Sequence, residues 1–114
     1  VSVMLNLPKS VRIFMATEPV DMRKQMDGLS TVVRSGLGRD PRSGEMFVFR
    51  NRRGDMARVL FFDQQGYCLL SKRLERGTFA DTPDGVEHLE LSAKDLALFL
   101  TATNPWGAQS KRKR

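Results

Sequence analysis

Three short apolar runs, separated by turn-forming residues, constrain the fold of this chain most strongly. They cover residues 46–50, 57–63 and 67–74 and are rich in β-branched and aromatic side chains. The junction DQQGY places Asp63 first and Gly66 fourth in a type I turn, which is typical of a three-residue hairpin loop closed by a G1 bulge. Consecutive strands with such short connections pair antiparallel, so the sequence predicts a β-meander.

Helical patterns flank this meander in the sequence. Before it, apolar residues at helical spacing follow Asp21, which can cap a helix that ends in the segment GLGRDP, residues 36–41. After it, Ser92 and Asp95 form a capping-box pattern that opens a helix through Leu100. Two further short strands are expected at residues 11–16 and 88–91. This order lacks the regular alternation of a doubly wound fold, so we expect an α+β fold with an antiparallel β-meander packed with two helices.

Both faces of the predicted meander are apolar. Phe47, Phe49 and Val59 alternate with residues such as Leu60 and Phe62, which are equally hydrophobic. Either the helices cover both faces, or one face is an interaction surface.

Length and composition predict one small domain. A chain of 114 residues with 40% hydrophobic and 28% charged residues suits a single core, which we place at residues 1–105, with a basic and disordered tail at 106–114. No apolar run reaches the roughly 18 residues of a membrane span, and the first residues do not resemble a secretory leader. We therefore expect a cytoplasmic protein without membrane contact, and we expect Cys68 to be a buried thiol.

Positive charge is concentrated in two places. The net charge is +6, and the terminal KRKR supplies four bases, whereas residues 50–76 hold seven bases against three acids. The rest of the chain holds eight bases and ten acids. We call the seven bases the basic cluster: Arg50, Arg52, Arg53, Arg58, Lys72, Arg73 and Arg76.

The meander is expected to gather the basic cluster at one end of the sheet. Lys72 and Arg73 return on the third strand beside Arg58, near the loop that carries Arg52 and Arg53. Two interpretations stay open: these side chains lie over apolar residues with their charged ends in water, or they bind an anionic partner.

Several sequence blocks resemble one known family. They are LPKSVRIFMAT (7–17), DMRKQMDGL (21–29), FVFRNRRGD (47–55), LFFDQQGYCLLSKRLERGTF (60–79) and SAKDLALFL (92–100). Together they are similar to the small accessory protein encoded by the second reading frame of insertion sequence 66 elements, often labelled TnpB. The resemblance implies participation in transposition together with a separate transposase, without a catalytic site in this component.

The residues themselves also argue against catalysis. One His and one Cys cannot form a zinc site, and no glycine-rich phosphate loop is present. Asp21 is expected to be a cap and Asp63 a turn residue, which leaves no evident carboxylate set for metal-dependent strand transfer. We expect no enzyme activity, metal, cofactor or small-molecule substrate.

Two functional hypotheses follow. The first is a non-enzymatic accessory factor in DNA transposition that contacts DNA backbone, or the transposition complex, through the basic cluster. The second is a protein-protein adaptor that docks on the transposase without direct DNA contact. Expected partners are the element-encoded transposase, other element proteins and DNA.

Overall fold

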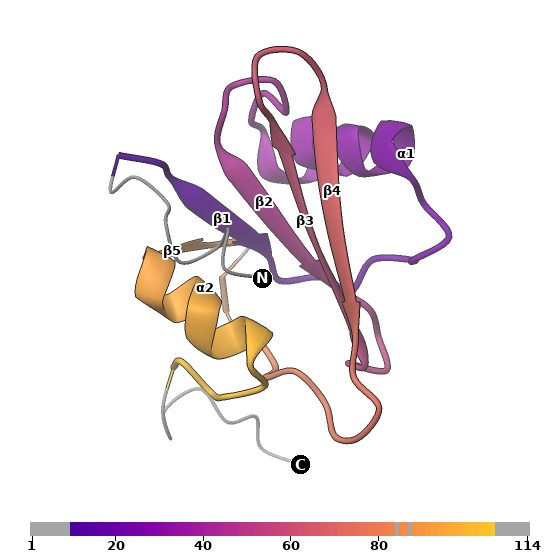
Figure 1. The fold of residues 1–114 in the computed structure, drawn as a ribbon, viewed down its shortest axis with the longest axis vertical. Helices are drawn as coiled ribbons and strands as arrows, with labels where there is room; N and C mark the ends of the chain where they lie inside the picture. Colours follow the sequence, from indigo (N-terminus) through magenta and orange to yellow (C-terminus); the bar gives the residue numbers. More distant parts are fainter. Residues whose placement is uncertain (1–9, 84, 87, 107–114) are drawn as a thin grey trace.

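The computed structural model describes residues 10–83, 85, 86 and 88–106, which form one five-stranded sheet with helices on both faces (Figure 1). The strands are β1 (Ile13–Ala16), β2 (Met46–Arg50), β3 (Met56–Phe62), β4 (Tyr67–Arg73) and β5 (His88–Leu91). The helical elements are α1 (Met26–Thr31), its π-helical continuation η2 (Val32–Leu37), and α2 (Ala93–Leu100).

The predicted meander is confirmed and occupies one side of the sheet. Strands β2, β3 and β4 pair antiparallel, with Val48 opposite Val59 and Leu60 opposite Leu69. The sheet order is β4-β3-β2-β1-β5, so β1 and β5 extend the meander beyond β2. The α+β fold class is therefore confirmed.

Strand β1 forms a parallel pair with β2 in this sheet. It runs parallel to β2, with Phe14 opposite Phe47, and antiparallel to β5. The helical segment α1–η2 provides the crossover that parallel neighbours require. As a result, the carboxyl ends of β1 and β2 lie at the same end of the sheet.

Helices cover both apolar faces of the sheet. Of the two alternatives for the meander, coverage by helices therefore applies, and among the described residues neither face is left as an open apolar interaction surface. One core joins the α1–η2 segment to one face, with Leu29, Val33, Phe14, Phe47, Phe49 and Leu60 among its members. The other joins α2 to the opposite face, with Leu96, Phe99, Met15, Val48, Val59 and Phe79 among its members. Burying each large apolar side chain contributes about 1.5–3 kcal/mol, so the two cores carry most of the folding energy.

The first helix begins later than the sequence predicts. α1 starts at Met26, with Gln25 as its N-cap, instead of directly after Asp21. The carboxylate of Asp21 accepts a hydrogen bond from the backbone N–H of Arg23 at 2.9 Å, and its oxygens also accept from the Arg23 guanidinium. Asp21 therefore closes a local turn and does not cap the helix. The end is as predicted, because Gly38 adopts a left-handed conformation with φ of 65°.

The second helix has the predicted capping box. The Ser92 hydroxyl accepts from the N–H of Asp95, and the Asp95 carboxylate accepts from the N–H of Ser92. Beyond it, the Trp106 indole donates to the carbonyl of Asp81 at 2.6 Å and packs on the α2 core. Apart from Trp106, the predicted tail 106–114 lies outside the described residues. None of the helices described here is long and apolar enough to cross a membrane.

Candidate nucleic-acid interface

The loop between β2 and β3 is held by the side chain of Asn51. Its Oδ1 accepts from the N–H groups of Gly54 at 2.9 Å and Met56 at 3.0 Å, and its Nδ2 donates to Asp55 at 2.7 Å. This amide hydrogen bond lowers the pKa of the Asp55 carboxyl below its ordinary value. Because the loop backbone is fixed in this way, Arg52 and Arg53 are presented outward at its tip, where both are exposed.

Gly54 is required by the same loop. Its φ is 81°, a left-handed conformation that costs a side-chain-bearing residue about 1 kcal/mol or more. A Cβ at this position would also overlap the guanidinium of Arg50 and lie 3.2 Å from the Cβ of Thr78. The glycine therefore allows the loop to pack tightly over Arg50.

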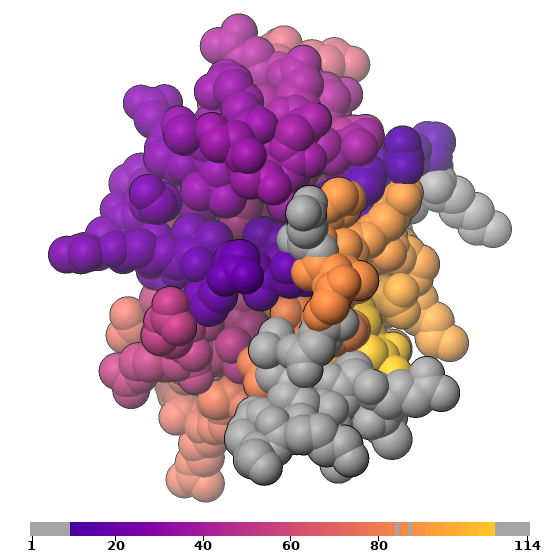
Figure 2. Space-filling view, turned by 180° about the vertical axis from the view of Figure 1, so that it is seen from behind, coloured from indigo at the N-terminus to yellow at the C-terminus, as the bar shows by residue number. Residues whose placement is uncertain are grey.

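Arg52, Arg53, Arg58 and Arg73 line one open groove together with Arg23, and we call this set the arginine groove. The groove has a volume of about 930 Å³ and a partly apolar wall that includes Val20, Met22 and Met56. Asp21 is the one acid among its described lining residues. Figure 2 shows this face, with the violet residues that follow β1 above the magenta-pink loop that follows β2.

Arg58 and Arg73 reach the groove because they share a face of the sheet. Arg58 pairs with Ser71, and Met56 pairs with Arg73. Because Met56 and Arg58 are two residues apart on β3, all four side chains lie on the same face of the sheet. The Nη1 of Arg58 donates to the carbonyl of Lys24 at 2.6 Å, which fixes the guanidinium. Its Nε is buried without a hydrogen-bond partner in the part of the chain that the structure describes.

Three residues of the basic cluster lie elsewhere. Arg50 is on the α2 face, where its guanidinium donates to the carbonyl of Phe79 at 3.0 and 3.2 Å and forms an ion pair with Asp81 at 3.2 Å. Lys72, on the same face, donates to the carbonyl of Leu100 at 2.7 Å and so caps the end of α2. Arg76 is exposed and is not among the described residues that line the groove.

Comparison with known proteins shows which family this chain belongs to. The model of the IS66 Orf2 like protein family matches residues 11–110. The chain belongs to this family. The resemblance seen in its sequence blocks is thereby confirmed, and membership carries an accessory role in transposition and an association with the transposition machinery of IS66 elements.

Two relatives of this IS66 Orf2-like chain come from Sinorhizobium fredii. The uncharacterized protein y4jC is 39% identical over 110 residues, which cover 96% of this chain and 92% of y4jC. The uncharacterized protein y4hO is 42% identical over 76 residues, covering 67% of this chain and 66% of y4hO. No solved structure matches the chain.

Arg23 is the groove residue that sequence reasoning missed in this IS66 Orf2-like chain. The sequence placed Arg23 inside the helix expected after Asp21, but it precedes the helix and lies in the turn closed by Asp21. Its guanidinium and backbone N–H donate to Asp21 and hold the pKa of that carboxyl at about 2. The signal in the sequence was the Pro19-Val20-Asp21 stretch, since proline and aspartate favour a turn over a first helical turn.

The other polar candidates of this IS66 Orf2-like chain have structural contacts. The rings of His88 and Phe14 make an edge-to-face contact, with centroids 5.9 Å apart. Cys68 is half-buried, not buried as expected; its Sγ lies 3.5 Å from an Asp63 carboxylate oxygen, and burial raises the pKa of its thiol. Within the described residues, no group of three or more His, Cys, Asp or Glu could hold a metal ion.

Proposed function

We propose that this IS66 Orf2-like protein is a non-enzymatic accessory factor in transposition that contacts the phosphate backbone of DNA through the arginine groove. The observation that carries this proposal is the convergence of five arginines from three chain segments on one open groove. The segments are the turn before α1, the β2–β3 loop, and the paired strands β3 and β4. The partner that we propose within the machinery is the element-encoded transposase, bound to the same DNA.

The chemistry of the groove supports phosphate as the ligand. A guanidinium presents parallel N–H donors that match two phosphate oxygens, and it is always charged. The one lining carboxylate, Asp21, is already engaged by Arg23 at 2.7 Å. Arg52, Arg53, Arg58 and Arg73 therefore keep a net positive field along the groove.

A non-enzymatic role agrees with the use of the acids near the groove. Asp21 closes a turn, Asp55 accepts from Asn51, and Asp63 accepts from two backbone N–H groups of the β3–β4 turn. These contacts occupy the carboxylates that metal-dependent strand transfer would need to converge on metal ions. The family to which the chain belongs is, in addition, not known as catalytic.

The second candidate is an adaptor that docks on the transposase without DNA contact. Because α1 and α2 cover both apolar faces of the sheet, such an adaptor would use the arginine groove against an acidic partner surface. Co-purification with the transposase after nuclease treatment separates the two candidates. A complex that survives nuclease favours the adaptor, and one that is lost favours a bridge made by DNA.

The direct test of DNA contact is binding to terminal-repeat and random duplexes across a salt series. If Arg52, Arg53, Arg58 and Arg73 each contact one phosphate, the slope of log K against log salt concentration should be about −4. The two duplexes should bind with similar affinity, because phosphate contacts carry no sequence information. Absence of binding to either duplex at low salt would overturn the proposal.

A further inference from the structure

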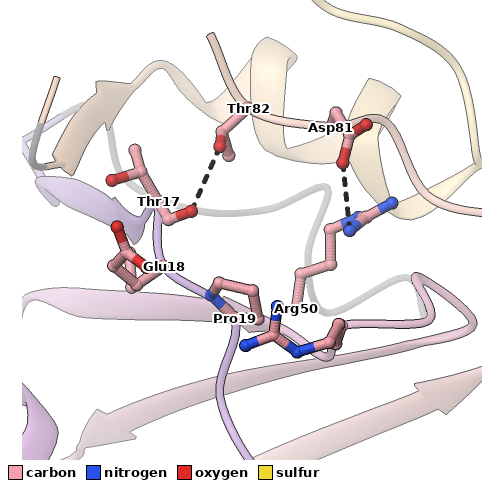
Figure 3. Close-up of a pocket in the computed structure, with 8 residues that line it drawn as sticks. Thr17, Glu18, Pro19, Arg50, Asp81 and Thr82 are labelled. Atoms are coloured by element: carbon pink, nitrogen blue, oxygen red, sulfur yellow. Dashed lines mark hydrogen bonds and ion pairs between the residues drawn. The ribbon is translucent and has the colours of Figure 1, made fainter. Parts of the chain in front are cut away.

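A second hollow borders the arginine groove at the carboxyl ends of β1 and β2. We call it the polar pocket, and its volume is about 360 Å³. It is lined by Ala16, Thr17, Glu18, Pro19, Arg50, Arg52, Asp81 and Thr82. Figure 3 places Thr17 and Glu18 on one side of the pocket and Arg50 with Asp81 on the other.

The polar pocket and the arginine groove are continuous through shared residues. Pro19 and Arg52 line both hollows. A ligand that places a phosphate on Arg52 can therefore extend into the pocket. In open α/β sheets, ligands bind outside the carboxyl ends of the parallel strands, and the polar pocket lies at the corresponding end of the parallel pair β1 and β2.

One wall of the pocket is a rigid, planar cation. The Arg50 side chain is only 14% exposed and is held by the Phe79 carbonyl and the Asp81 carboxylate. The Gly54 loop packs against one part of this guanidinium and the pocket borders another, so a nucleobase that enters the pocket can stack on the part that lines it. The volume lies near the lower end of the range of roughly 300–1,000 Å³ found for small-ligand pockets, which suits one base better than a larger group.

The opposite wall offers an open hydrogen-bond acceptor. Glu18 is exposed, and its carboxylate makes no hydrogen bond or ion pair with any residue that the structure describes. A carboxylate accepts from the exocyclic amino group of a base such as cytosine. Thymine presents a carbonyl oxygen at the corresponding position, and two acceptors facing each other repel.

We propose that the polar pocket binds an unpaired nucleobase with an exocyclic amino group, from a DNA single strand whose phosphates lie on the arginine groove. This inference rests on the proposed function and deepens it, because it names single-stranded DNA as the preferred substrate. Base edges are free to reach Glu18 only where the strand is unpaired, whereas the arginine groove contacts phosphates in either form.

Cytosine and thymine oligonucleotides test the proposal, since these two pyrimidines are of similar size. Single strands of oligo(dC) and oligo(dT), each about eight nucleotides long, fit the site sizes of small single-strand binders. At equal salt, the wild-type protein is expected to bind oligo(dC) on the order of tenfold more tightly than oligo(dT). In Glu18→Gln the ratio should fall to about one, because the amide can donate to the thymine carbonyl.

The matched control is Glu75→Gln, which removes the same charge from an exposed residue outside both hollows. It should keep the wild-type ratio, although both variants gain some affinity from the lost negative charge. Equal wild-type affinity for both oligonucleotides, or an unchanged ratio in Glu18→Gln, would overturn the pocket assignment while the arginine groove still bound DNA. Failure to bind either oligonucleotide at low salt would overturn this proposal and the proposed DNA contact together.

Discussion

Arg50 and Arg52 are two residues apart in the sequence, but the side chain of Arg50 is mostly buried and Arg52 is exposed. Arg50 ends β2, points to the α2 face and holds the segment around Phe79 and Asp81. Arg52 lies in the loop, is exposed, and lines both the arginine groove and the polar pocket. Arg50 is therefore expected to matter for stability as well as for the wall of the polar pocket, whereas Arg52 is expected to matter for ligand binding alone.

Arg50→Gln should lower the free energy of unfolding by about 1–3 kcal/mol, because the shorter, neutral amide cannot reach both the Phe79 carbonyl and the Asp81 carboxylate as the guanidinium does. Arg52→Gln should change it by no more than about 0.5 kcal/mol, as an exposed substitution does. Urea denaturation of both variants measures the difference. Equal losses of stability would contradict the separate roles assigned to these residues.

The pair formed by Asp21 and Arg23 predicts a titration at low pH. Hydrogen bonds from Arg23 depress the folded-state pKa of Asp21 to about 2, below the ordinary value of about 3.9. The stabilisation from this shift is thus fully present above about pH 4 and is lost as the pH falls toward 2. Carboxyl NMR should show the low midpoint in the wild type and a return toward the ordinary value in Arg23→Gln. A wild-type midpoint near 4 would exclude the pair in solution.

The sequence could place arginines at one end of the sheet but could not assign them to its faces. The return of β4 beside β3 follows from the short turn at Asp63, so Arg58 and Arg73 could be grouped with the loop arginines. The face of each side chain depends on register, and a shift of one residue exchanges the faces. Arg50 and Lys72 therefore could not be separated from the groove before the structure.

At the scale of elements, the β3–β4 turn differs from the type I turn with a G1 bulge that the sequence predicts. The N–H of Asp63 donates to the carbonyl of Gly66 at 3.1 Å, which leaves a two-residue loop. The left-handed φ of 88° falls on Gln64, and Gly66 is not among the residues with positive φ. Two-residue hairpin loops favour positive φ at their first central position, which matches the strand twist.

Gln64→Gly should therefore raise the free energy of unfolding by about 1 kcal/mol, because glycine adopts positive φ without steric cost. Gln65→Gly is the matched control in the same loop, and it should bring no gain because Gln65 has no positive φ. Thermal or urea unfolding of the two variants and the wild type measures these changes in the free energy of unfolding. A larger gain from Gln65→Gly would contradict the observed turn geometry.

The elements themselves were largely predictable, and their pairing was only partly so. The meander, the strand at residues 88–91 and the capping box of α2 follow from local patterns. The parallel pairing of β1 with β2 does not, because apolar residues in a short strand do not specify which neighbour they meet. The late start of α1 was missed because Asp21 uses its carboxylate for Arg23.

At the scale of the whole molecule, the residues that we propose to bind ligand gather at one end of the sheet. The carboxyl ends of β1 and β2, the start of β3 and the end of β4 meet there, and the arginine groove and the polar pocket lie between the loops that follow. Arg50 donates to the Phe79 carbonyl, and Lys72 donates to the Leu100 carbonyl at the end of α2. These hydrogen bonds hold the strands that carry the groove against the rest of the fold. Such pre-organisation lowers the entropy cost of binding.

The most direct test of the arginine groove compares two double variants that lose equal charge. Arg52→Gln with Arg53→Gln removes two groove arginines, whereas Arg34→Gln with Lys94→Gln removes two exposed bases that do not line the groove. The measurement is the affinity for one DNA duplex across a salt series. The groove double should reduce the magnitude of the salt slope by about two, while the control double keeps the wild-type slope. The same slope for both double variants would contradict a phosphate-binding arginine groove.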